Sequence, residues 1–164
     1  MKFKRDYLLL QKKWLEKFGW QFFKDLTKDD QYNLDNIRIP SSESQEEFDI
    51  LILFLVKSII DSINEEKLIL QDNFKDDGTK ISGISKLERW FQEQSISGFE
   101  HHVQFLRNLQ ELRSTGTGHK KGKNYQKASK KFEIGAKSLI DVFEEILNDA
   151  DNFIIFLTNY AEQQ

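Results

Sequence analysis

The sequence contains no cysteine, and it has only one proline and eight glycines among its 164 residues. Without cysteine there is no disulfide scaffold, no cysteine-ligated zinc or iron–sulfur site and no cysteine nucleophile. The scarcity of helix-breaking residues favours long helices over a turn-rich β-sandwich or barrel. The lack of cysteine is also compatible with a reducing cytoplasm.

The sequence also lacks a long apolar run. The longest one, residues 50–56, is far shorter than the roughly 20 residues that a membrane-spanning helix needs. Lysines and a glutamate interrupt the apolar residues near the N-terminus, so no signal-peptide core is expected there. We therefore expect a soluble, cytoplasmic protein that makes no membrane contact.

The composition is sufficient for one folded domain. Hydrophobic residues make up 38% of the chain, charged residues 31%, and there are 14 phenylalanines. That apolar content supports a real core and argues against disorder. A length of 164 residues suits a single domain.

Apolar side chains recur at helical spacing in the N-terminal half. In residues 3–26 they step by three or four, which predicts a first helix over this range. Residues 27–42 are polar and read as a connection. A second helix is expected from Ser44 to about Glu66, because Ser44 and Glu47 have the spacing of an N-terminal capping box. Apolar residues on all its sides predict that this helix is the most buried one.

The C-terminal half predicts three further helices. Residues 71–83 read as a loop, followed by helices at about 84–95 and 99–114. In residues 125–161 the apolar positions alternate steps of four and three, which predicts one long final helix. The expected fold is an all-α, up-and-down bundle of about five helices with a long C-terminal helix. We divide the chain, residues 1–164, into an N-terminal helical extension with its connection (1–40) and a helical core (44–164).

Charge is distributed unevenly. Residues 113–131 contain seven cations and no carboxylate, which leaves a net charge of −10 for the rest of a chain whose total is −3. A basic segment of this kind can attract a polyanion such as nucleic acid even when the whole protein would not. The alternative is a solvated, lysine-rich loop without a ligand.

Two polar residues fall on the apolar face of the helix expected at 99–114. On a helical wheel, His102 and Arg113 line up with Leu106 and Leu109. An arginine on a packed face is costly unless it is paired or faces a cavity or an interface. Alternatively, Arg113 extends outward from the helix end, and His102 is an ordinary core residue.

A glycine-rich stretch follows Arg113 and leads to His119. Its spacing is not that of a phosphate-binding P-loop or a dinucleotide-binding fingerprint. Three histidines without cysteine or a His-Glu-x-x-His motif form no convincing zinc ligand set. We therefore expect no metal and no cofactor.

The residue types in this stretch fit metal-free cleavage of RNA by its own 2′-hydroxyl. His119 can move a proton near neutral pH, and Arg113 can stabilise the negatively charged phosphorane. These two residues are the catalytic candidates. Lys120, Lys121 and Lys123 would hold flanking phosphates, and Tyr125 would stack on a base or bond to a phosphate. The substrate-binding candidates also include His102 and Ser114.

The segment FLRNLQELRSTGTGHKKG, residues 105–122, resembles the core of prokaryotic HEPN domains. Their motif is an arginine, four to six residues and a histidine near the final long helix of an all-α domain. Here five residues separate Arg113 from His119. Many active members carry Asn, Asp or His directly after the arginine, where this chain has Ser114.

The resemblance implies a metal-independent endoribonuclease of a toxin–antitoxin or antiphage defence system. It also implies RNA as substrate, a homodimer in which two Arg/His pairs face one cleft, and an antitoxin or defence-system partner protein. Arg113 would then point at the dimer seam. Two alternatives stay open: a non-catalytic HEPN module that binds RNA or a protein, and a plain helical interaction domain.

Overall fold

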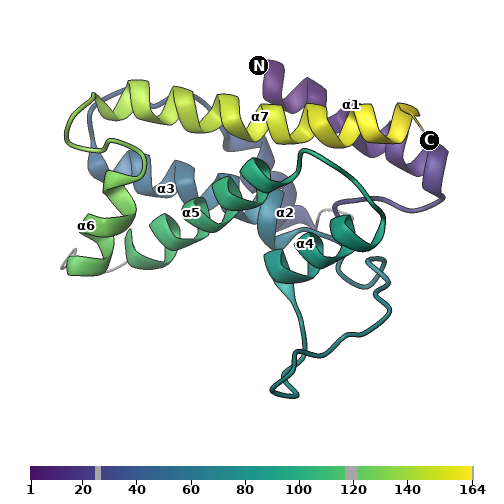
Figure 1. Cartoon of the computed structure of the whole chain (residues 1–164). Helices are drawn as coiled ribbons and strands as arrows, with labels where there is room; N and C mark the ends of the chain where they lie inside the picture. Colours follow the sequence, from purple (N-terminus) through teal and green to yellow (C-terminus); the bar gives the residue numbers. More distant parts are fainter. Residues whose placement is uncertain (25–26, 117–121, 164) are drawn as a thin grey trace.

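The computed structural model describes residues 1–24, 27–116 and 122–163. Within these ranges the chain forms helices and isolated β-bridges but no strand, so the all-α prediction is confirmed (Figure 1). The elements are α1 (Lys2–Phe18), α2 (Lys28–Asn36), α3 (Gln45–Val56), the π-helical turn η1 (Lys57–Asp61), α4 (Gly83–Glu93), α5 (Glu100–Gly116), α6 (Lys123–Lys130) and α7 (Leu139–Gln163).

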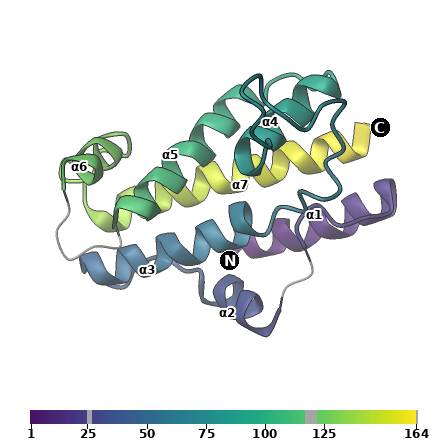
Figure 2. The same cartoon turned by 90° about the horizontal axis from the view of Figure 1, so that it is seen from below.

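Helix α7 extends along the length of the bundle, with α3 and α1 following one another beside it (Figure 2). All three run in the same direction. Lys2 at the start of α1 contacts Asp151 in the middle of α7, and Lys13 contacts Glu162 near the end of α7. Phe48, near the start of α3, packs against Phe143, near the start of α7.

Helix α5 runs opposite to α7 and determines where the candidate site lies. Near its start, the ring centroid of His102 is 4.7 Å from that of Phe156 on α7. At its end, Gly116 lies beside Tyr125 of α6 and Asp49 of α3. The last turn of α5, the start of α3 and the start of α6 therefore meet at one end of the bundle (Figure 1).

Aromatic side chains form the core at the opposite end. The indole of Trp14 on α1 is fully buried. The other rings come from α1, the segment after it, α4 and α7, and they are those of Phe18, Trp20, Phe22, Trp90 and Tyr160. The N-terminal segment is thus part of the same hydrophobic core as the rest of the chain.

The expected single final helix at 125–161 is wrong, because α6 and α7 are separate. Between them Glu133 and Gly135 adopt positive φ angles of 55° and 93°, a backbone conformation that ends a helix. The hydroxyl of Ser138 then accepts a hydrogen bond from the backbone N–H of Asp141 at 3.0 Å and caps the start of α7. The apolar spacing continues across the break, which is why the pattern did not reveal it.

The N-terminal half differs from expectation at two helix ends and in one additional helix. Helix α1 ends at Phe18 rather than near residue 26, because Gly19 adopts the left-handed conformation (φ 75°) that closes the helix. The connection at 27–42 contains the short helix α2. The α3 segment becomes a π-helical turn after Val56 and ends at Asp61.

The expected N-terminal cap of α3 is present. The hydroxyl of Ser44 accepts a hydrogen bond from the backbone N–H of Glu47 at 3.4 Å. The carboxylate of Glu47 does not complete the capping box but accepts hydrogen bonds from Ser41 and Ser42. Among the described residues, none of the helices has both the length and the apolar character needed to cross a membrane.

Candidate functional site

Arg113 lies in the last turn of α5 and is half-buried. Its guanidinium Nη2 is 3.6 Å from Oδ2 of Asp61, and the side chains of the two residues are 32% and 41% exposed. A partly exposed pair at this distance contributes only about 0–1 kcal/mol to stability. The pair therefore satisfies the charge of Arg113 without fixing the guanidinium in place.

The partner carboxylate comes from an unusual element. Asp61 is the last residue of the π-helical turn η1, which follows α3. Such turns are rare and are found frequently at functional sites. Asp61 was not predictable as a partner of Arg113, because 52 positions separate the two residues in the sequence and no local pattern links them.

The hydroxyls that follow Arg113 bond to their own helix. Ser114 Oγ donates to the backbone carbonyl of Gln110 at 2.5 Å, and Thr115 Oγ1 donates to that of Glu111 at 2.7 Å. Bonds of this kind are local to a helix turn. Ser114 is exposed, but its hydroxyl must leave Gln110 before it can donate to a ligand.

A shallow hollow lies between the end of α5 and the start of α6. Its volume is about 330 Å³, and it is lined by Thr115 and residues 122–125. Lys123 is exposed at this hollow, whereas Tyr125 is only 7% exposed. Tyr125 Oη accepts a hydrogen bond from Nε2 of Gln45 at 3.1 Å. Tyr125 therefore joins α6 to α3 and presents little ring surface for stacking on a base.

Three of the predicted site residues, His119, Lys120 and Lys121, lie outside the described residues. They fall between Gly116 and Gly122, the two nearest residues that the structure describes. The structure thus brings the end of α5, with Arg113 and Ser114, and the start of α6, with Lys123 and Tyr125, to the same end of the bundle (Figure 1). His119 lies between these residues in the sequence.

Exposed lysines follow along α6. Lys123, Lys127 and Lys130 are all exposed on this helix. Lys131, just after it, pairs with Glu111 on α5 at 2.6 Å. Among the described residues of the predicted basic segment, Arg113 and Lys131 are paired with carboxylates. The exposed lysines of its described part that lie on α6 are Lys123, Lys127 and Lys130.

His102 is not part of this site. It precedes Arg113 by eleven positions, which places the two about 16 Å apart along α5. Its side chain is 5% exposed and packs against Phe153 and Phe156 of α7. Burial and, to a smaller extent, the neighbouring His101 together lower the pKa of His102 to about 4. His102 is a neutral core residue in this structure.

The buried imidazole predicts a pH dependence of stability. His102 has a pKa of about 4 in the folded chain against an ordinary value of 6.5, so the unfolded chain takes up the proton first as the pH falls. The contribution of the neutral imidazole to the free energy of unfolding is complete above pH 6.5. As the pH falls from 6.5 to about 4, this contribution is lost, and the free energy of unfolding decreases by up to roughly 3 kcal/mol. Urea unfolding at several pH values measures this loss.

A variant assigns that pH dependence to one residue. His102→Leu removes the titrating group, so the free energy of unfolding should change much less between pH 6.5 and 4. His101→Gln is the matched control, because His101 is exposed, and it should keep most of the slope. An unchanged slope in His102→Leu would show that other groups cause the acid sensitivity.

The part of the chain that the structure describes contains no cluster of three or more His, Cys, Asp or Glu side chains arranged to hold a metal ion. Comparison with models of known protein families, with curated proteins and with solved structures finds no match to this chain.

Proposed function

We propose that this chain is a metal-independent endoribonuclease of the HEPN type that acts as a homodimer on single-stranded or loop RNA. Its setting would be a prokaryotic defence or toxin–antitoxin system in the cytoplasm, with an antitoxin or defence protein as partner. The observation that carries the proposal is the position of half-buried Arg113 at the end of α5. The segment containing His119 follows it directly, and then comes the lysine-bearing helix α6.

The reaction needs only groups of this kind and the RNA itself. The 2′-hydroxyl attacks the adjacent phosphorus, the bond from phosphorus to the 5′-oxygen breaks, and a 2′,3′-cyclic phosphate and a 5′-hydroxyl form. His119 moves the proton between these oxygens. Arg113 stabilises the negative charge on the non-bridging oxygens, for which it must leave Asp61. Lys123 and the other lysines of the segment bind flanking phosphates.

A second copy of the chain supports this chemistry. One protomer supplies a single Arg113–His119 pair, whereas proton transfer to and from two different oxygens is served best by two histidines. Two copies would face each other across the end of α5, with one RNA strand between them.

A non-catalytic RNA-binding module is the second candidate. Two observations favour it: the Ser114 hydroxyl is bonded to its own helix, and Arg113 is paired with Asp61. In this case the lysines of α6 bind RNA and no bond is broken.

Incubation of the purified chain with a mixed RNA pool in EDTA tests the proposal. The nuclease should shorten the RNA despite the chelator, because no metal takes part. RNA that is retained intact, with retention lost when Lys123, Lys127 and Lys130 are replaced by glutamine, would support the binding module instead. If the chain neither cleaves nor retains RNA, both candidates are contradicted.

A further inference from the structure

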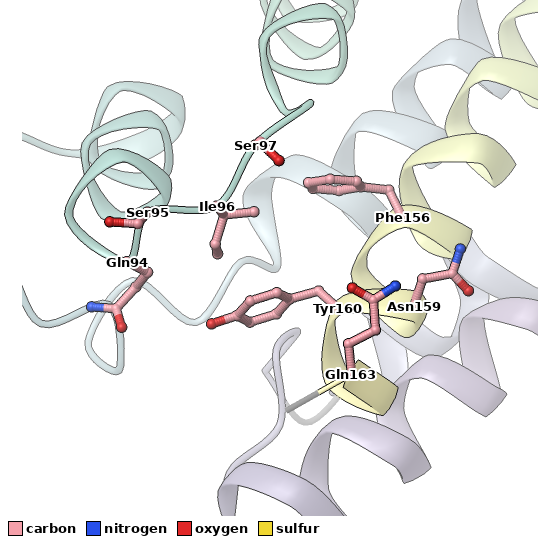
Figure 3. A pocket seen from close by; sticks show the side chains of 8 residues that line it. All are labelled: Gln94, Ser95, Ile96, Ser97, Phe156, Asn159, Tyr160 and Gln163. Carbon is pink, nitrogen blue, oxygen red and sulfur yellow. The ribbon is translucent and has the colours of Figure 1, made fainter.

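A separate pocket lies at the other end of α5 from Arg113. It is formed by the connection between α4 and α5, residues 94–97, and by the last turns of α7 (Figure 3). Its volume is about 360 Å³, which is within the range of small-molecule sites. This site does not depend on the proposed nuclease function.

The lining of this pocket carries no formal charge. From α7 come Phe156, Asn159, Tyr160 and Gln163, and the connection adds Gln94, two serines and Ile96. Burial raises the pKa of Tyr160, so its hydroxyl is protonated at neutral pH and can donate a hydrogen bond. A charged ligand would find no opposite charge among these residues, so the pocket suits an uncharged one.

Two aromatic rings supply the apolar surface. Phe156 and Tyr160 are one helical turn apart on α7, and Ile96 lies opposite them (Figure 3). The core holds both rings from behind: Tyr160 stacks on Phe18 at 5.9 Å, and Phe156 packs against His102 at 4.7 Å. Both rings are therefore fixed in position before any ligand arrives.

The polar groups are distributed on several sides of the pocket. In Figure 3, Ser97 lies near Phe156, Gln163 lies near Tyr160, and the hydroxyl end of Tyr160 points to the side formed by Gln94. Carboxamides and hydroxyls each donate and accept hydrogen bonds. A ligand that fits this lining has an apolar face and a rim of groups that both donate and accept.

We propose that this pocket binds a neutral sugar ring. A pyranose has hydroxyls all round its rim, each both donor and acceptor, and C–H groups on its faces that pack on aromatic rings. A nucleobase fits less well, because each polar atom on its edge is either a donor or an acceptor, whereas each sugar hydroxyl is both. A sugar phosphate or uronic acid brings a negative charge that no group in the lining neutralises.

Titration of the isotope-labelled full chain with neutral monosaccharides, followed by NMR of the backbone amides, tests this site. Glucose, galactose, mannose and N-acetylglucosamine are the probes. At least one should shift the amides of Ile96, Ser97 and Tyr160 saturably, with a Kd on the order of 1 mM. Glucuronate and glucose 6-phosphate should bind about tenfold more weakly. No saturable shift with any neutral sugar, or tighter binding of adenosine at the same amides, would overturn the proposal.

Two substitutions test the contacts without disturbing the core. Gln163→Ala and Tyr160→Phe should each weaken sugar binding by about tenfold, and Tyr160→Phe keeps the ring that packs on Phe18. Asn152→Ala is the matched control, because Asn152 is exposed on α7 but does not line the pocket. Unchanged affinity in both pocket variants would contradict the assignment. RNA cleavage should be the same in all three variants.

Discussion

Replacement of His119 by alanine is expected to slow RNA cleavage by about 10²–10⁴-fold, because proton transfer by a positioned side chain contributes that much to a rate. Arg113→Ala should slow cleavage by about 10²–10³-fold, since it removes the cation that stabilises the phosphorane. Both losses should appear in single-turnover cleavage of a labelled RNA in EDTA. The folded chain should be retained, because Arg113 makes only a weak, partly exposed ion pair.

Matched variants separate these effects from a general loss of charge or imidazole. His101→Ala changes an exposed histidine near the start of α5, and Arg89→Ala removes an arginine that pairs with Glu93 on α4 at 3.0 Å. Both should cleave RNA at the rate of the unchanged chain. Full activity in His119→Ala and Arg113→Ala would remove both residues from the catalytic site.

Trp14→Ala should have the largest effect on stability, a loss of about 3–5 kcal/mol in the free energy of unfolding. Trp14 is fully buried and contacts rings from α1, α4, α7 and the segment after α1. Its removal leaves a cavity where α1 packs against α7. The total free energy of unfolding of a domain of this size is only about 5–15 kcal/mol. Urea unfolding at neutral pH will therefore detect the loss easily.

The adjacent residue provides the control for this substitution. Leu15 is 45% exposed on the same helix, so Leu15→Ala should cost less than about 0.5 kcal/mol. Trp14→Phe should cost much less than Trp14→Ala, because the indole N–H has no hydrogen-bond partner among the described residues and its loss leaves no partner unsatisfied. Similar losses for Trp14→Ala and Leu15→Ala would contradict the importance of this cluster.

Features fixed by local residue patterns were predictable from the sequence. Ser44 caps the N-terminus of α3, as its spacing with Glu47 indicated. The acidic and asparagine residues at 148–152 do not interrupt α7, as the apolar spacing on either side predicted. In both cases a few neighbouring side chains decide the structure, so the sequence contains the necessary information.

Features that depend on single backbone angles were not predictable. The break between α6 and α7 rests on Glu133 and Gly135, while the apolar spacing continues as if one helix ran through. At the end of α1, Gly19 closes the helix, although apolar residues follow it at helical spacing. These residues, Phe22 among them, are buried all the same, because the chain turns back into the core.

The candidate site was predictable only in part. The helical wheel placed Arg113 and His102 on the same apolar face of α5, but it could not distinguish the surroundings of the two side chains. Arg113 meets the carboxylate of Asp61 from a distant part of the chain, and His102 meets the aromatic rings of α7. Both partners are far away in the sequence, so only the packed bundle separates a candidate site residue from a core residue.

The proposed reaction depends most directly on the 2′-hydroxyl of the RNA. The measurement that tests it is the cleavage, in EDTA, of one RNA and of its copy with 2′-deoxynucleotides at the mapped cut sites. The proposal predicts rapid cutting of the RNA to 2′,3′-cyclic phosphate ends, and no cutting of the copy at the substituted positions. Equal cutting of both, or products with 5′-phosphate ends, would show that the RNA is not its own nucleophile and would contradict the assigned chemistry of Arg113 and His119.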